Sequence, residues 1–293
     1  MTHPALEILD LKLQFRTISS VNTVLHGINV TINPRERVAL VGESGSGKSV
    51  TARLILGLLQ EQKGVVTQGL IRFYGEDLQA LPDLKREALR GREISMIFQD
   101  PTSSLNPVFT IAALFHEVLA RRQTGISLKQ ANAKAIELLT EVSIQDPQRV
   151  LDSYAFQLSG GLNQRIMIAM ALANQPKLLI ADEPGTALDV SVQAQTLRLM
   201  RDMVTQYGTA VLFISHNLGV VREFADRVYV IYQGRIVESG TTEQIYQSPR
   251  HAYTQALLAA VPRLTGDGLS DVADDVSRYQ EPAFHHQPTA VPS

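Results

Sequence analysis

The 293-residue chain contains no cysteine, which excludes disulfide bonds, thiolate zinc sites and cysteine-ligated iron–sulfur clusters. Its longest uninterrupted apolar stretch is residues 166–173, far short of the roughly 18 residues that a membrane-spanning helix needs. It also lacks an excess of one charge: the net charge of −2 gives no general electrostatic reason to bind nucleic acid or an anionic membrane. Residues 1–4 lack the basic segment and apolar run of a signal peptide. We therefore expect a soluble, cytoplasmic protein with no nucleic-acid partner.

The hydrophobic pattern predicts antiparallel β structure at the N-terminus and a parallel sheet further along. Apolar and polar residues alternate over residues 9–15 and 28–32, as in strands with one buried face and one wet face. Four short runs are almost wholly apolar, which suits strands covered by helices on both faces. These runs are residues 38–41, 94–98, 178–181 and 211–214. Residues 228–232 and 235–238 predict a hairpin around Gln233-Gly234.

A phosphate-binding loop of the pattern G-x-x-x-x-G-K-[ST] follows the first of these runs and precedes a helical stretch, residues 49–59. Glycines let the backbone turn so that successive N–H groups point at phosphates, and the helix N-terminus adds positive potential. Lys48 is expected to reach the β- and γ-phosphates, and Ser49 to ligate Mg²⁺. The loop, our predicted nucleotide-binding segment, consists of Gly42, Glu43, Ser44, Gly45, Ser46, Gly47, Lys48 and Ser49.

Two carboxylates, Asp182 and Glu183, end the apolar run at residues 178–181. At a strand end beside a phosphate loop, Asp182 could hold Mg²⁺ through water and Glu183 could polarise the attacking water. An acidic loop without a catalytic role is the alternative that the carboxylates alone leave open. The chain has no Asn-Lys-x-Asp segment to read guanine, which disfavours a GTPase.

Residues 158–165, Leu-Ser-Gly-Gly-Leu-Asn-Gln-Arg, lie between the loop and the carboxylates. The segment resembles the LSGGQ signature of ABC ATPases, with Leu-Asn-Gln after the two glycines. Alone, Ser-Gly-Gly before a helix is more often a plain helix cap. In the family the signature grips the γ-phosphate of the nucleotide bound by a partner subunit. The resemblance assigns that role to Ser159, Gly160, Gly161 and Gln164.

The resemblance, which covers about residues 5–262, implies further roles. Gln99 matches the glutamine that contacts Mg²⁺ and couples the nucleotide to a membrane domain, and His216 matches the switch histidine at the γ-phosphate. Asp189 matches the D-loop. The expected aromatic beside adenine is not evident, and Phe15 is our candidate.

The implied fold is α/β: a P-loop NTPase (RecA-like) core with an N-terminal antiparallel β subdomain and an inserted helical subdomain. We place the ABC ATPase domain at residues 1–262, its helical subdomain at about residues 100–175, and a polar tail, expected to be disordered, at residues 263–293. ATP and Mg²⁺ are the expected ligands.

Two segments are similar to importers of oligopeptides, dipeptides and nickel: residues 98–107, an extended glutamine loop, and residues 250–258, a C-terminal motif. The similarity implies that this chain works at the cytoplasmic face of the inner membrane with three kinds of partner. They are a second ATPase subunit, either a paralogue or a second copy, two membrane permeases and an external solute-binding protein. Peptides are favoured as cargo, and nickel or metal chelates remain open.

The sequence departs from the family at three positions: Gly185 stands where threonine is usual, Asn217 where aspartate is common, and Ala252 where proline is usual. Gly185 adds backbone freedom near Glu183 and is expected to alter the rate of hydrolysis more than the ability. A DNA-repair or translation ATPase is the alternative class. It is disfavoured because only 111 positions separate Lys48 from Ser159, too few for a long coiled coil, and because the chain holds one cassette. A low-activity subunit is disfavoured because every expected catalytic residue is present.

Overall fold

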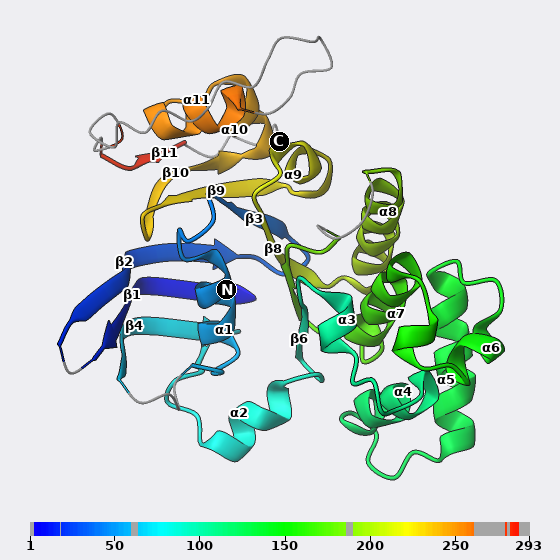
Figure 1. The fold of residues 1–293 in the computed structure, drawn as a ribbon. Helices are drawn as coiled ribbons and strands as arrows, with labels where there is room; N and C mark the ends of the chain where they lie inside the picture. The colour runs from blue at the N-terminus through cyan, green and yellow to red at the C-terminus, as the bar shows by residue number, and fades with distance from the viewer. Residues whose placement is uncertain are drawn as a thin grey trace. The chain divides into compact units, whose positions relative to one another are not determined.

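The computed structural model describes residues 3–17, 19–59, 64–185, 190–260, 279 and 282–286. The chain divides into two compact units. The first unit comprises residues 1–80 and 212–293, and the second comprises residues 81–211. Figure 1 shows the elements of both.

The N-terminal part of the first unit is a four-stranded antiparallel sheet in the order β2-β1-β4-β5. Its strands are β1 (Leu6–Arg16), β2 (Val21–Ile32), β4 (Val65–Phe73) and β5 (Glu76–Asp77). The predicted alternation is interrupted by a bulge at Asp10, which has a left-handed φ of 45° and shifts the register on both neighbouring strands. The extra residue reverses the faces. Ile8 and Leu11 are therefore buried together, whereas Leu9 and Phe15 are only half-buried, contrary to the pattern expected from the sequence.

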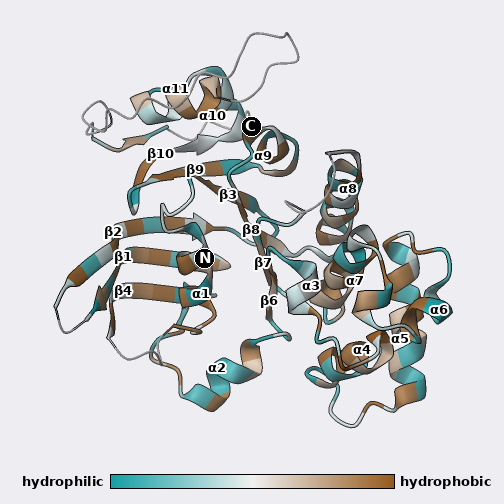
Figure 2. Cartoon of the chain, in the orientation of Figure 1, coloured by the Kyte–Doolittle hydropathy of each residue, from teal (hydrophilic) through white to brown (hydrophobic). Residues whose placement is uncertain are grey.

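The other strands of the first unit lie in the order β11-β10-β9-β3-β8. They are β3 (Arg37–Val41), β8 (Ala210–Ser215, which belongs to the first unit from residue 212 on), β9 (Arg227–Tyr232), β10 (Arg235–Thr241) and β11 (Phe284–His285). β3 runs parallel to β9, and β9 forms the expected antiparallel hairpin with β10. Residues 38–41 and 210–215 are buried, and Figure 2 colours these strands as strongly hydrophobic. The apolar runs thus form the interior strands that the sequence predicted.

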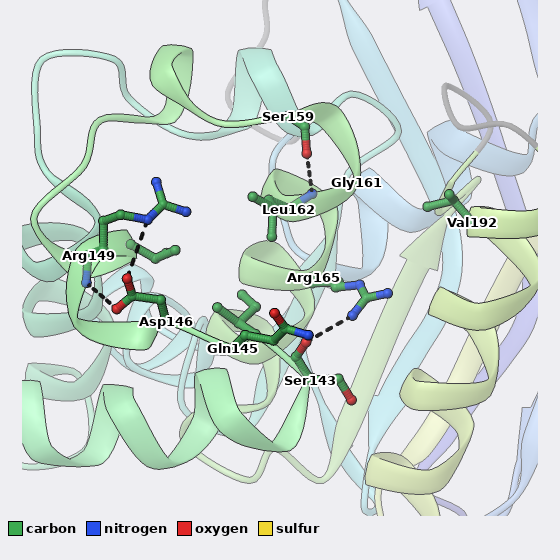
Figure 3. A pocket seen from close by; sticks show the side chains of 11 residues that line it. Ser143, Gln145, Asp146, Arg149, Ser159, Gly161, Leu162, Arg165 and Val192 are labelled. Atoms are coloured by element: carbon green, nitrogen blue, oxygen red, sulfur yellow. Dashed lines mark hydrogen bonds and ion pairs between the residues drawn. The ribbon is translucent and has the colours of Figure 1, made fainter.

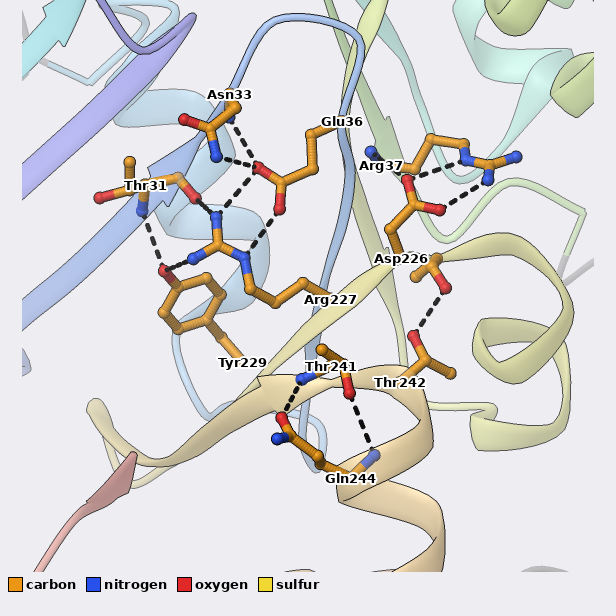
Figure 4. Close-up of polar contacts among 11 residues, drawn as sticks. Thr31, Asn33, Glu36, Arg37, Asp226, Arg227, Tyr229, Thr241, Thr242 and Gln244 are labelled. Carbon is orange, nitrogen blue, oxygen red and sulfur yellow. Dashed lines mark hydrogen bonds and ion pairs between the residues drawn. The ribbon is translucent and has the colours of Figure 1, made fainter. Parts of the chain in front are cut away.

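A polar network fixes the start of β3 against β9 (Figure 4). The guanidinium of Arg227 donates to both carboxylate oxygens of Glu36, at 2.8 and 3.0 Å, and to the carbonyl of Thr31. Arg37 pairs with Asp226 next to it. Because Arg presents a rigid fork of donors, these contacts fix both position and direction. The start of β3 is therefore held in a defined position against β9, before the chain turns at Gly42.

Helices complete the first unit. They are α1 (Lys48–Ile55), α9 (Leu218–Phe224), α10 (Thr242–Gln247) and α11 (Ala252–Ala259). In Figure 1, α10 and α11 lie together beside β10.

Part of the C-terminal tail lies against β10 within the first unit. Phe284 and His285 pair in parallel with Glu238 and Ser239 of β10, and Nε2 of His286 donates a hydrogen bond to the buried carboxylate of Glu238 at 2.8 Å. Residues 284–285 therefore extend the edge of β10, whose outer backbone groups are open to pairing. Disorder of the tail at residues 263–293 as a whole stays a prediction.

The second unit holds a parallel pair of strands, β6 (Ile94–Ile97) and β7 (Leu178–Asp182), and a set of helices. The helices are α2 (Asp83–Leu89), α3 (Pro101–Ser104), α4 (Ile111–Ala120), α5 (Leu128–Glu141), α6 (Pro147–Leu151), a 3₁₀ turn at Ala155–Gln157, α7 (Gly160–Leu172) and α8 (Val190–Tyr207). The predicted helical stretch at 127–142 is α5, which begins with a capping box between Ser127 and Gln130. Within the described ranges, no helix combines the length and the apolar character needed to cross a bilayer.

Candidate functional site

The predicted phosphate loop joins β3 to α1 in the first unit. Gly47 precedes the helix with a φ of 106°, and α1 begins at Lys48. Lys48 as a whole is only 4% exposed, and its ammonium folds back into the loop, where it donates to the carbonyls of Gly42 and Glu43 at 2.7 Å each. A lysine that satisfies its charge on two loop carbonyls is positioned to exchange them for phosphate oxygens.

Two observations on the loop itself fit a phosphate ligand. The hydroxyl of Ser46 is buried and has no hydrogen-bond partner within the described part of the chain, and buried polar atoms are seldom left unpaired. A Cβ built on Gly45 would meet no atom within 4 Å, so this part of the loop faces open space. Ser49, half-buried in the first turn of α1, supplies the hydroxyl expected for Mg²⁺. The residues present therefore fit nucleotide phosphates with a magnesium ion.

The β9–β10 hairpin holds the loop from the other side. The N–H of Gly234 donates to the carbonyl of Ser46 at 3.1 Å, and the carbonyl of Gly234 accepts the N–H of His26 at 2.9 Å. The carbonyl of Ile231 lies so close to Gly42 that a Cβ there would come within 2.1 Å. Glycine at position 42 is thus required by close approach of another strand, in addition to any ligand.

His216 follows β8 in the same unit and is exposed. The next residue, Asn217, caps α9, since its side-chain oxygen accepts the N–H groups of Gly219 at 3.0 Å and Val220 at 3.4 Å. Asparagine and aspartate serve equally well in such a cap. The departure from aspartate at this position therefore preserves the local structure beside His216.

Phe15 lies half-buried near the end of β1, opposite Asn22 on β2. Two residues before it, Leu13 pairs with Leu25, and the side chain of Leu25 closely approaches Gly47 of the phosphate loop. The candidate aromatic is therefore on the strand pair that borders the loop, and its contact with adenine stays a prediction.

The second unit contains the predicted carboxylates and the glutamine. Asp182 ends β7 and is 6% exposed. The side-chain amide of Gln99 donates to a carboxylate oxygen of Glu183 at 3.3 Å. The structure thus brings together two residues that lie 84 positions apart in the sequence, and it does so at the ends of the neighbouring strands β6 and β7.

Backbone geometry beside these carboxylates is unusual. Glu183 has a φ of 49° and Gly185 a φ of 94°. A β-branched residue such as threonine is strained at such an angle, whereas glycine is not. Gly185 therefore suits the local path of this chain. The predicted D-loop residue Asp189 lies outside the described residues.

The signature segment begins α7. Ser159 is the N-cap, and its hydroxyl accepts the N–H of Leu162 at 3.4 Å. Both Ser159 and Gly160 are exposed. The sequence presented a plain helix cap and the signature role as alternatives, but the two are compatible. An exposed cap leaves the glycine N–H groups at a helix N-terminus, which favours anions.

Gln164 does not lie with Ser159 on the exposed end of α7. Its side chain is fully buried, at 0% exposure, on the inward face of the helix. Leu162 instead lines, with Ser159 and Gly161, a cavity of about 440 Å³ (Figure 3). The assignment of Gln164 as a nucleotide contact has no support from this geometry, because five residues along a helix place it more than one turn from the cap.

Arg165 is a residue of this segment whose role the sequence did not indicate. Its guanidinium donates to the carbonyls of Ser143 (Figure 3) and Val142, both at 3.2 Å, and to the side chain of Gln195 at 2.9 Å. It therefore ties α7 to the end of α5 and to α8. No local signal identifies such a contact, because its partners lie 22 to 30 positions away.

The two groups of residues belong to different units. Phe15, the phosphate loop and His216 are in the first unit, and Gln99, the signature, Asp182 and Glu183 are in the second. Their assembly into one catalytic site stays a prediction.

Comparison with known proteins decides the family. The sequence model described as "ABC transporter" matches residues 25–186. This chain belongs to the ABC transporter family. A second model, "Oligopeptide/dipeptide transporter, C-terminal region", matches residues 237–283. The resemblance stated from the sequence and the predicted fold class are both confirmed.

Two curated relatives match nearly all of this ABC transporter family member. The peptidoglycan transport ATP-binding protein YejF of Agrobacterium fabrum is 50% identical over 262 residues, which are 89% of this chain and 48% of the relative. The oligopeptide transport ATP-binding protein OppD of Bacillus subtilis is 46% identical over 267 residues, which are 91% of this chain and 74% of the relative. The chain thus spans about half the length of the first of these relatives.

A solved structure supports the fold independently. The dimeric, post-hydrolysis ATP-binding cassette MJ0796, bound to ADP and phosphate, superposes with a TM-score of 0.71 at 25% identity. The match covers 81% of this chain and 98% of the other.

Proposed function

We propose that this chain is the ATP-hydrolysing subunit of an ABC importer for dipeptides and oligopeptides. The observation that carries the proposal is the match of residues 237–283 to the C-terminal region of oligopeptide and dipeptide transporters. The names of its relatives support it, since OppD is an oligopeptide transport ATP-binding protein and several Brucella relatives at 47% identity carry names that describe peptide import.

The predicted roles divide among the residues as follows. The N–H groups of the phosphate loop and the ammonium of Lys48 hold the phosphates. Ser49, Asp182 and Gln99 are the residues expected around Mg²⁺, which when bound neutralises phosphate charge. Glu183 orients the attacking water and draws its proton, and the hydrogen bond from Gln99 holds that carboxylate in place.

His216 and the D-loop residue Asp189 complete the proposed catalytic set. His216 donates to the γ-phosphate, and the signature residues Ser159 to Gly161 contact the nucleotide held by the partner ATPase. Two nucleotides are thereby enclosed between two subunits. Closure is stable only while the γ-phosphate contacts exist, so hydrolysis releases it.

Such a cycle requires partners. We propose a second ATPase subunit, two membrane permeases and an external solute-binding protein, with this chain on the cytoplasmic face of the membrane. Co-purification from native membranes under gentle detergent tests this assembly. Recovery of two permeases is expected, and recovery of DNA-repair or ribosomal proteins in their place would contradict it.

Uptake experiments test the cargo and the chemistry together. The chromosomal copy is replaced by Glu183→Gln, and uptake of a labelled tripeptide, a dipeptide and Ni²⁺ is measured. Glu243→Gln, an exposed glutamate of α10, is the matched control. We expect peptide uptake to fall at least tenfold in Glu183→Gln and to be unchanged in Glu243→Gln. Undiminished peptide uptake in Glu183→Gln, or loss of Ni²⁺ uptake alone, would refute the proposal.

A further inference from the structure

The C-terminal helix α11 touches the phosphate loop. The hydroxyl oxygen of Tyr253 accepts the backbone N–H of Glu43 at 3.0 Å. The two residues lie 210 positions apart, and the ring of Tyr253 is fully buried, at 0% exposure. A helix from the region matched by the oligopeptide-transporter model therefore contacts the loop that the ATPase model matches.

Glu43 is the residue through which the loop holds its shape. Its carbonyl accepts the ammonium of Lys48 at 2.7 Å and the N–H of Ser46 at 3.2 Å. The peptide groups of Glu43 thus join Tyr253 on one side to the phosphate-binding lysine on the other. Any displacement of this residue changes where Lys48 and Ser46 lie.

Two further tyrosines hold the ring of Tyr253. Its centroid is 4.2 Å from that of Tyr232 on β9 and 5.5 Å from that of Tyr279, which meets both rings edge-on. Aromatic rings at these separations attract one another beyond their buried area. Burial raises the pKa of the Tyr253 phenol above its ordinary value, and burial together with the nearby Glu43 carboxylate raises that of Tyr232. Both phenols are neutral near pH 7.

The start of α11 is also fixed. The buried carboxylate of Glu238 accepts the N–H groups of Arg250 and His251, at 3.0 Å each. The ring of His251 caps the helix by accepting the N–H of Tyr253 at 3.1 Å. Tyr253 is thereby held at its ring and at its backbone.

We propose that Tyr253 is a positioning residue for nucleotide binding, which it supports by holding Glu43 and, through it, Lys48 and Ser46 in the geometry that receives phosphate. The inference deepens the proposed function, because it rests on nucleotide binding at this loop. It assigns to the C-terminal region a direct part in the ATPase cycle.

The test is titration of the full chain with MgADP, which needs no signature from a partner subunit. Tyr253→Phe removes the acceptor oxygen and keeps the ring. Tyr229→Phe is the matched control, since the hydroxyl of Tyr229 accepts the backbone N–H of Thr31 at 3.2 Å and lies in the network away from the loop (Figure 4). We expect the dissociation constant of MgADP to rise about two- to tenfold in Tyr253→Phe, the range of one ordinary hydrogen bond. We expect no change in Tyr229→Phe.

Hydrogen exchange of the wild-type chain provides a second measurement that does not depend on a variant. Because coupling between two sites is reciprocal, MgADP should slow exchange of the α11 amides as well as those of the loop. Equal affinity of the Tyr253→Phe and wild-type chains, or protection of the loop with none in α11, would overturn the inference. Failure of the wild-type chain to bind MgADP would instead contradict the proposed function.

Discussion

Replacing Gly234 by alanine tests whether the β9–β10 turn supports the phosphate loop. Gln233 and Gly234 form the turn with φ values of 45° and 72°, the left-handed pair that two-residue hairpins require. The N–H of Gly234 donates to Ser46 in the loop, and its carbonyl accepts the N–H of His26. A displacement of Gly234 is therefore transmitted to Ser46 in the phosphate loop and to His26 on β2.

The cost of the substitution has two parts. An alanine forced into the left-handed region loses about 1–2 kcal/mol. A Cβ on Gly234 would also lie 2.0 Å from the carbonyl oxygen of Val24, and a backbone atom can yield only if the strand moves, which costs about 1–3 kcal/mol more. We expect Gly234→Ala to lower the free energy of unfolding by about 2–5 kcal/mol.

The first unit offers a matched control. Tyr74 and Gly75 form a second turn with φ values of 49° and 86°, but the nearest atoms to a Cβ on Gly75 belong to the side chain of His3, at 3.1 Å. Gly75→Ala is therefore expected to cost only the conformational part, about 1–2 kcal/mol. Urea unfolding followed by circular dichroism gives the stabilities, and MgADP titration gives the affinities.

The stabilities and MgADP affinities of the two variants distinguish the effect of close approach from that of backbone conformation alone. Gly234→Ala should be the less stable of the two and should bind MgADP more weakly than the wild type, whereas Gly75→Ala should bind it normally. Equal stabilities would refute the argument from close approach. Normal MgADP affinity in a destabilised Gly234→Ala would refute the argument that the turn supports the loop.

Three further substitutions have defined outcomes. Arg165→Met removes the hydrogen bonds from α7 to α5 and to Gln195; it should lower the stability of the second unit by about 1–3 kcal/mol in urea unfolding and leave MgADP affinity unchanged. Arg227→Lys loses the two-oxygen contact with Glu36; about 1–2 kcal/mol of stability should be lost, measured in the same way. Glu238→Gln removes a carboxylate whose pKa is lowered: burial alone would raise the pKa, but the neighbouring Thr254 hydroxyl and the hydrogen bonds from Arg250, His286 and His251 outweigh burial. A lowered folded-state pKa stabilises above the unfolded value of about 4.3. The wild type should therefore be more stable than Glu238→Gln at pH 7, and this difference in stability should shrink as the pH falls below about 4. A difference that does not depend on pH would contradict the lowered pKa of Glu238.

The sequence predicted what depends on local pattern. The apolar runs became β3, β6, β7 and β8 because a strand buried on both faces needs apolar residues at every position. The stretch at 127–142 became α5 because a Ser-x-x-Gln capping box begins a helix with few breakers. The phosphate loop was identifiable because its chemistry requires fixed residue types at fixed spacing.

Features that depend on distant contacts or on one inserted residue were not predictable in this way. The bulge at Asp10 reverses the buried face of β1, and a strict period of two cannot show it. The burial of Gln164 depends on which side of α7 faces inward, and α7 is apolar on most sides. The contacts of Gln99 with Glu183 and of Tyr253 with Glu43 join residues 84 and 210 positions apart, so no local pattern carries them.

A series of hydrogen bonds links the C-terminal region to the phosphate loop. Glu238 on β10 accepts the N–H groups that precede α11, the capped helix holds Tyr253, and Tyr253 accepts the N–H of Glu43 beside Lys48. This series of hydrogen bonds ends at the buried carboxylate of Glu238, which accepts hydrogen bonds from Arg250, His251 and His286. Loss of its charge therefore leaves buried donors without an anion. If Tyr253 positions the loop, Glu238→Gln should weaken MgADP binding as well as stability, by no more than Tyr253→Phe does. The double variant should then show less than the product of the two effects, because both substitutions act through the same contact.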